Sequence, residues 1–137
     1  MASSGHLLRS VLLLLLLLAT TPTTTATNWK SMLYGETEAK YYAARGIMNS
    51  LIEMYNLKNG PLFTLAIPQM VDVFSRVADD GITTEYMVDI AAFLIIRGEI
   101  WWLAPKIRLF SQKSRYENSL ENIRVVTMKL SKKVGPG

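Results

Sequence analysis

Apolar residues recur at helical spacing between residues 36 and 57. At positions i, i+3, i+4, i+7, i+8 and i+11 stand Ala44, Ile47, Met48, Leu51, Ile52 and Tyr55. This spacing places them on one stripe of an α-helix. Glu36 and Glu38 lie in the first turn, where negative charge suits the helix dipole. Asn59-Gly60-Pro61 ends the element, so the pattern predicts an amphipathic helix over residues 36–57.

Two further apolar stripes predict a second and a third helix. The second begins near Thr64, has Pro68 in its first turn and runs to about Ala78, before the stop at Asp79-Asp80-Gly81. Its stripe consists of Ile67, Met70, Val71, Phe74, Val77 and Ala78. The third has Thr83 as its N-cap, and its inner face consists of Met87, Ile90, Ala91 and Leu94, with Trp101 as a further candidate.

The third predicted helix is apolar on nearly all sides, because Ala92, Phe93, Ile95 and Ile96 fill its other faces. Such a helix is either buried at the centre of the fold or in contact with another apolar surface. Arg97-Gly98-Glu99 interrupts the run, which is then too short for a membrane span. Ile100 to Ala104 is expected to form a bend that carries two tryptophans.

A fourth helix is predicted from Lys106 to about Asn122, with Pro105 at its start and a capping-box pattern at Ser114-Arg115-Tyr116-Glu117. From Ile123 to Leu130 the pattern favours extended structure. No partner strand is evident for this segment, so we expect it to lie as an unpaired strap across the bundle. The predicted fold is therefore all-α: a compact bundle of four to five helices with an extended C-terminal strap.

The first 26 residues have the form of a secretory signal peptide. Arg9 precedes an apolar run from Val11 to Ala19, and small polar residues lead to a cleavage site after Ala26. The predicted organisation is a signal peptide over residues 1–26 and a single helical domain over residues 27–137. We expect the protein to be secreted.

The composition argues against most enzyme classes. The chain has no cysteine, and its one histidine, His6, lies in the predicted signal peptide. The usual general base, thiol nucleophile and soft metal ligands are therefore missing from residues 27–137. Asp79-Asp80 is the only adjacent carboxylate pair, and before a glycine it is more typical of a turn. We predict no catalytic residues, no metal site, no cofactor and no enzymatic activity. A carboxylate-based enzyme would require acidic groups that converge in one cleft.

Charge is divided along the chain. Residues 27–100 carry a net charge of −3, and residues 101–137 carry +6. This asymmetry suggests a face that meets an anionic partner, although a solvated surface would explain it as well. The predicted partner-binding residues are Lys106, Arg108, Lys113, Arg115, Arg124, Lys129, Lys132 and Lys133. Nucleic acid is not expected, because the chain is predicted to be secreted.

Trp101-Trp102-Leu103 lies just before the first of these cations. Indole rings prefer boundaries between an apolar environment and water. Neighbouring side chains on a helix point about 100° apart, so one tryptophan is expected in the core and one on the surface. The predicted residues for membrane or apolar contact are Trp29, Trp101, Trp102, Leu103 and Phe110.

The mature chain resembles the gastropod sperm acrosomal proteins, the abalone-type sperm lysin and its fusogenic paralogue. The resemblance depends on the aromatic start Asn28-Trp29-Lys30 and on two predicted long amphipathic helices joined near Asn59-Gly60, the second of which contains Val73-Phe74-Ser75-Arg76. It also depends on an extended basic tail from Ile123 to Gly137. It implies a non-enzymatic fertilization protein of the acrosomal granule that binds egg vitelline-envelope glycoprotein or takes part in membrane fusion. The chain is shorter and less basic than lysin, which favours the fusogenic branch.

The leading hypothesis is therefore a secreted sperm protein that binds an egg coat or an anionic membrane surface, with a homodimer left open. The alternative is a secreted helical carrier of a lipid or another small apolar molecule, which would need an enclosed cavity.

Overall fold

The computed structural model describes residues 28–33 and 37–134. The predicted signal peptide and its cleavage site lie outside this part of the chain. In chain order the elements are β1 (Lys30–Ser31), α2 (Glu38–Asn59), β2 (Phe63–Val77), β3 (Thr83–Ile96), β4 (Ile100–Ser114), β5 (Glu121–Lys129) and β6 (Lys132–Lys133).

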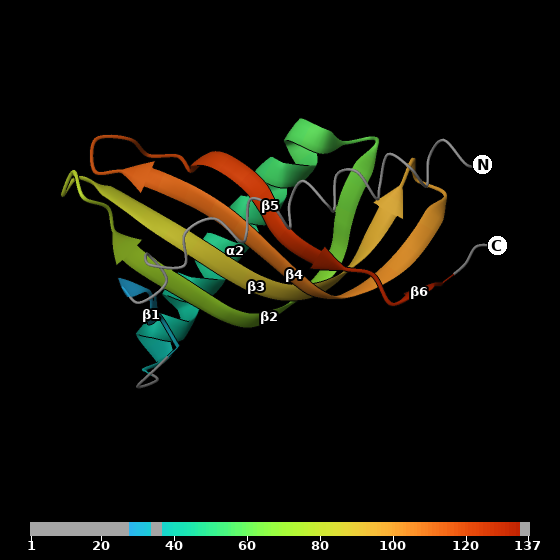
Figure 1. The fold of residues 1–137 in the computed structure, drawn as a ribbon, viewed down its shortest axis with the longest axis horizontal. Helices are drawn as coiled ribbons and strands as arrows, with labels where there is room; N and C mark the ends of the chain where they lie inside the picture. Colours follow the sequence, from blue (N-terminus) through green and yellow to red (C-terminus); the bar gives the residue numbers. More distant parts are fainter. Residues whose placement is uncertain (1–27, 34–36, 135–137) are drawn as a thin grey trace.

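The strands form one antiparallel sheet in the order β1-β2-β3-β4-β5, and β6 also pairs with β4. The helix α2 lies diagonally behind this sheet in the view of Figure 1. We call the side of the sheet that packs on α2 the helix face and the opposite side the outer face. The prediction of an all-α bundle is wrong, because the described chain is a mostly antiparallel sheet with a single α-helix.

The first predicted helix is confirmed. The structure places α2 over Glu38–Asn59, with Thr37 as its N-cap and the Thr37 side chain accepting a hydrogen bond from the backbone N–H of Lys40. Five of the six predicted stripe residues are buried, namely Ala44, Met48, Leu51, Ile52 and Tyr55, and the sixth, Ile47, is partly buried. The helical stripe of this segment therefore predicted both the element and its buried side.

The other three predicted helices are strands. The segment from Thr64 to Ala78 is mostly β2, and the helix expected from Thr83 is β3. The segment from Lys106 to Asn122 instead contains the second half of β4, a turn and the first residues of β5. The bend expected at Ile100 to Ala104 is the start of β4.

Two hairpin turns replace the expected helix ends. In the β2–β3 turn, Ala78 donates a backbone hydrogen bond to Thr83 (2.8 Å) and Gly81 has a φ of 73°. In the β3–β4 turn, Gly98 also has a φ of 73°. This left-handed conformation favours glycine, because a side chain there is strained. The two glycines therefore reverse the chain into antiparallel neighbours.

The core lies between α2 and the helix face. Adjacent strands contribute paired residues to it, including Val73 opposite Val88, Val88 opposite Leu109, and Leu65 opposite Leu94. These side chains are almost fully buried, and each contributes about 1.5–3 kcal/mol relative to an exposed position. Because alternate residues of a strand point to opposite faces, the same strands also present a second set of side chains on the outer face.

The extended segment predicted after Ile123 is confirmed as extended, but it is not a strap without a partner. It forms β5, which pairs with β4 at Phe110–Arg124, Leu109–Val125 and Ile107–Met128. Val125 and Met128 pack against the core on the helix face. The segment therefore completes the sheet.

Candidate functional site

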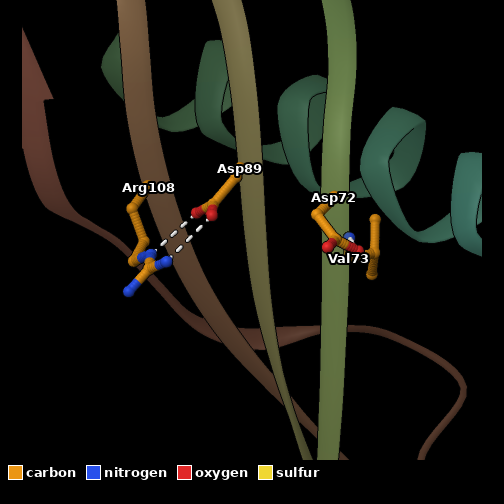
Figure 2. Close-up of polar contacts among 4 residues, drawn as sticks. All are labelled: Asp72, Val73, Asp89 and Arg108. Atoms are coloured by element: carbon orange, nitrogen blue, oxygen red, sulfur yellow. Dashed lines mark hydrogen bonds and ion pairs between the residues drawn. The ribbon is translucent and has the colours of Figure 1, made fainter. Parts of the chain in front are cut away.

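The centre of the outer face holds an ion pair across two strands. Asp89 of β3 stands directly opposite Arg108 of β4. The Arg108 Nε donates to Asp89 Oδ1 at 2.7 Å and its Nη2 donates to Asp89 Oδ2 at 2.8 Å, as Figure 2 shows. This two-point geometry matches the fork of a guanidinium to a carboxylate. The hydrogen bond to Asp89 raises the pKa of Arg108 above its ordinary value.

A second carboxylate, Asp72, lies opposite Asp89 on β2 (Figure 2). Its Oδ1 accepts hydrogen bonds from the Ser31 hydroxyl at 2.6 Å and from the backbone N–H of Val73 at 2.8 Å. Asp72 thereby ties the short strand β1 to the sheet. Each of the two carboxylates has its own partners, so the arrangement resembles a structural network more than an acid–base pair. Within the described residues, no cluster of three or more potential ligands suits a metal ion.

Aromatic rings and arginines alternate at one end of the outer face. The guanidinium carbon of Arg76 lies 4.4 Å from the ring centroid of Trp29, and Arg76 also pairs with Glu85 at 2.8 Å. The guanidinium carbon of Arg124 lies 4.7 Å from the ring centroid of Phe110. Phe110 itself is buried. Trp29 and Phe110, both predicted as contact residues, are therefore each stacked with an arginine of the same chain.

The other end of the outer face is apolar. Phe93 stands opposite Leu103, and Ile95 stands opposite Trp101. The rings of Phe93 and Trp101 lie 5.9 Å apart, centroid to centroid. All four side chains are partly exposed. We call Phe93, Ile95, Trp101 and Leu103 the apolar patch. Within the described part of the chain, the one α-helix covers the opposite side of the sheet.

The two neighbouring tryptophans point to opposite faces. Trp102 packs against the core on the helix face, whereas Trp101 belongs to the apolar patch. The sequence predicted one core and one surface tryptophan from helical geometry. The division arises instead from the alternation of a strand.

Five of the eight predicted cations lie along the β4, β5 and β6 side of the outer face. Lys106 stands directly opposite Lys129, and Lys132 stands opposite Leu103 of the apolar patch. Arg108 and Arg124 lie further along the same face, where Arg108 is paired with Asp89 and Arg124 covers Phe110. We call Lys106, Lys129 and Lys132 the cationic edge. All three are exposed.

The remaining predicted cations lie elsewhere. Lys133 stands opposite Trp102. Lys113 is opposite Thr84, near the β2–β3 turn. The Nη2 of Arg115 donates to the backbone carbonyl of Gly81 at 3.3 Å, so this arginine joins two turns. The structure therefore gathers only part of the predicted basic set on one surface.

Asp80, of the only adjacent carboxylate pair, organises the β2–β3 turn. Its carboxylate accepts from the backbone N–H groups of Ile82 (2.9 Å) and Thr83 (2.8 Å) and from the Thr83 hydroxyl (2.6 Å). The Thr83 hydroxyl, followed by these backbone bonds, holds the pKa of Asp80 below its ordinary value of 3.8. The sequence-based interpretation of Asp79-Asp80 as part of a turn therefore agrees with the hydrogen bonds of Asp80.

Two hollows of the described surface are bordered in part by charged side chains. One, of about 380 Å³, is bordered by Glu85, Phe110 and Arg124 among others. The other, of about 300 Å³, is bordered by Asp89, Lys106 and Arg108. A carrier site for an apolar molecule is expected to be lined mainly by apolar side chains. The first hollow does not have that lining, and the second, although partly apolar, is open to solvent and not an enclosed cavity.

Sequence reasoning missed Phe93 and Ile95 as surface residues, because it placed them on a central helix. The signal for them was the alternation of Ala91, Phe93 and Ile95 with the buried Ala92 and Leu94, which is the period of a strand. Among the described residues, the structure has no helix long and apolar enough to cross a membrane.

Comparison with protein-family models, curated proteins and solved structures found no match for this chain. Membership in the gastropod sperm acrosomal family therefore stays a prediction. The all-α fold that the sequence pattern predicted, and on which this resemblance partly depended, is wrong for the described residues.

Proposed function

We propose that this chain is a non-enzymatic binding protein that attaches to anionic membrane surfaces. One observation carries the proposal: the cationic edge borders the apolar patch on the outer face, and Lys132 stands directly opposite Leu103. Anionic headgroups attract the lysines, and the partly exposed rings of Phe93 and Trp101 suit the boundary between headgroups and acyl chains. The same juxtaposition is not needed for a stable sheet, because the core lies on the other face.

The mechanism has two steps. Each lysine near an anionic bilayer contributes about 1 kcal/mol, and this attraction falls off within about 8 Å at physiological salt. The cationic edge therefore brings the protein to the surface and orients it. Burial of the apolar patch side chains then adds a favourable contribution to the binding free energy that salt does not screen. Binding is expected to need anionic lipid and to weaken, without vanishing, as salt rises.

A charge-reversal experiment tests this proposal. The protein without its predicted signal peptide (residues 27–137) is mixed with vesicles of phosphatidylcholine alone or with added phosphatidylserine. Bound protein is measured by co-sedimentation. The double variant Lys106→Glu/Lys129→Glu should lose most binding to the anionic vesicles. The matched control is Lys40→Glu/Arg45→Glu, which makes the same charge change at exposed positions of α2, and it should lose far less. Equal losses in both variants, or no binding by the wild type, would contradict the proposal.

Egg vitelline-envelope glycoprotein as the partner, a fusogenic role and storage in the acrosomal granule stay predictions from the resemblance. Vesicle leakage and lipid mixing in the same experiment test the fusogenic version. The small-molecule carrier receives less support, because both hollows are open to solvent and each is bordered by charged side chains, including Arg124 and Arg108.

A further inference from the structure

One end of the sheet carries exposed apolar side chains from several separate elements. At this end the α2–β2 turn, the β3–β4 hairpin and β6 meet, as the right-hand side of Figure 1 shows. The backbone N–H of Arg97 donates to the carbonyl of Leu62 at 2.9 Å, and that of Val134 donates to the carbonyl of Trp101 at 2.7 Å. These bonds hold the segments together. We call this end the tip.

The exposed side chains of the tip are aliphatic. Leu62 is 54% exposed, Ile100 is 38% exposed and Val134 is 37% exposed. Leu57, in the last turn of α2, is 77% exposed. The opposite end also exposes apolar side chains, namely Val77, Ile82 and Tyr116, so exposed apolar residues alone do not identify the tip as a contact surface. The apolar patch begins at the tip, because Trp101 directly follows Ile100 in β4.

Charge distinguishes the tip from the opposite end. Exposed cations lie beside the aliphatic side chains: Lys58 near Leu57, Arg97 in the hairpin, and Lys132 and Lys133 in β6. Glu99 is the acidic residue of the hairpin. The opposite end instead has three exposed acids in its two turns, Asp79, Asp80 and Glu117, against one exposed cation, Arg115. An anionic surface therefore attracts the tip and repels the other end.

We infer that the tip enters an anionic lipid bilayer, with Leu62 and Ile100 among the upper acyl chains and the neighbouring cations at the phosphates. This inference rests on the proposed function and adds to it the depth and orientation of docking. Charge complementarity selects lipid as the occupant, because aliphatic side chains spaced between cations match a layer in which acyl chains lie beneath anionic headgroups. The sheet then lies tilted, with the tip deepest in the bilayer and the outer face turned toward the headgroups, so that Trp101 lies at the boundary and the cationic edge stays near the phosphates.

The absence of cysteine makes this orientation directly measurable. Leu62→Cys and Ile100→Cys place a polarity-sensitive fluorophore at the tip, and Tyr116→Cys places it at the opposite end, where the side chain is 75% exposed. With vesicles that contain phosphatidylserine, labels at positions 62 and 100 should shift their emission to shorter wavelength and be quenched by lipids brominated on the acyl chain. The label at position 116 should show neither effect.

Unlabelled variants provide an independent measurement. Leu62→Ser and Ile100→Ser should each weaken vesicle binding by about tenfold, as loss of a buried aliphatic side chain predicts, while circular dichroism reports whether each variant remains folded. The matched control Tyr116→Ser should bind as the wild type does.

The outcomes separate the two proposals. If the wild type does not bind anionic vesicles, the proposed function fails and the tip inference fails with it. If the wild type binds but the labels at positions 62 and 100 remain in water, the tip inference is overturned and the proposed function stands. Quenching at position 116 in place of the tip would likewise overturn the orientation alone.

Discussion

The side-chain amide of Asn56 pairs with the backbone of Leu65 as a neighbouring strand would. The backbone N–H of Leu65 donates to Asn56 Oδ1 at 2.8 Å, and Asn56 Nδ2 donates to the Leu65 carbonyl at 3.0 Å. At this point β2 lies at the edge of the sheet, because β1 pairs only with Phe74 and Ser75 further along. Asn56 therefore fixes α2 to β2 and satisfies edge groups that would otherwise need another partner.

Removal of this amide should destabilise the protein. Asn56→Ala leaves a part-buried N–H and carbonyl without their partners, and we expect the free energy of unfolding to fall by about 1–3 kcal/mol. Urea denaturation should show a lower midpoint with an unchanged slope. Asn49→Ala is the matched control, since Asn49 is an exposed position on the same helix. Alanine has a higher helix propensity than asparagine, so Asn49→Ala should cause no loss of stability, and a similar loss in both variants would contradict the role given to the Asn56–Leu65 pairing.

The sequence predicted α2 correctly because only one side of that helix is buried. Polar residues fill the other sides of this helix, so its apolar residues recur visibly with the helical period of 3.6. In β3 both faces are apolar: Val88, Ile90 and Leu94 face the helix, while Phe93 and Ile95 lie on the outer face. A strand that is apolar on both faces loses its period of two and also satisfies a helical template.

Strand length added to this error. The strands β2, β3 and β4 have 15, 14 and 15 residues, whereas typical strands have about 5–6. Apolar runs of such length suggest helices. Asp80-Gly81 is typical of a β-hairpin turn, but next to a predicted helix the same pair indicates a helix stop. The cationic residues were identified from charge alone, yet only pairing register could bring Lys106 beside Lys129.

The β2–β3 turn should become less stable in acid. The pKa of Asp80 is held below 3.8 by its bonds to Thr83 and Ile82, so its contribution is fully present above pH 3.8 and is lost as the pH falls through the lower, folded-state value. The difference in unfolding free energy between the wild type and Asp80→Asn should therefore be largest above pH 3.8 and shrink below it. A difference that does not change with pH would contradict this assignment.

Thr83→Val tests the cause of that pKa shift. Valine keeps the branched shape but removes the hydroxyl, which is the largest contributor to the lowered pKa. The pKa of Asp80, followed by NMR of its carboxyl carbon, should rise toward 3.8 in this variant. The backbone bonds from Ile82 and Thr83 remain, so the return should be partial.

Ser111 offers a stabilising substitution. Its side chain is fully buried on β4, and its Oγ makes no hydrogen bond in the described structure. Burial of an unsatisfied hydroxyl is unfavourable, so Ser111→Ala should raise the free energy of unfolding by about 1 kcal/mol. Ser114→Ala is the control, because the Ser114 Oγ accepts from the backbone N–H of Tyr116 at 3.3 Å and the change should bring no gain. A loss of stability in Ser111→Ala would show that the hydroxyl has a partner in solution.

The two adjacent tryptophans should separate folding from binding. Trp102 packs against the core on the helix face, so Trp102→Ala should lower the free energy of unfolding by about 3 kcal/mol. Trp101 lies on the outer face against Phe93, where its removal loses one partly exposed ring contact and should cost about 1 kcal/mol. Binding to vesicles that contain phosphatidylserine should show the opposite order, with Trp101→Ala weaker than Trp102→Ala under conditions in which both remain folded.

This reversal is a stringent test because the two residues are neighbours in one strand and have the same side chain. A general loss of structure would weaken folding and binding together in both variants. If Trp101 acts at the surface, Trp101→Ala weakens binding but keeps most of the stability, because the alternation of β4 places the Trp101 ring away from the core. If Trp102→Ala alone abolished binding in a folded protein, the helix face and not the outer face would be the contact surface.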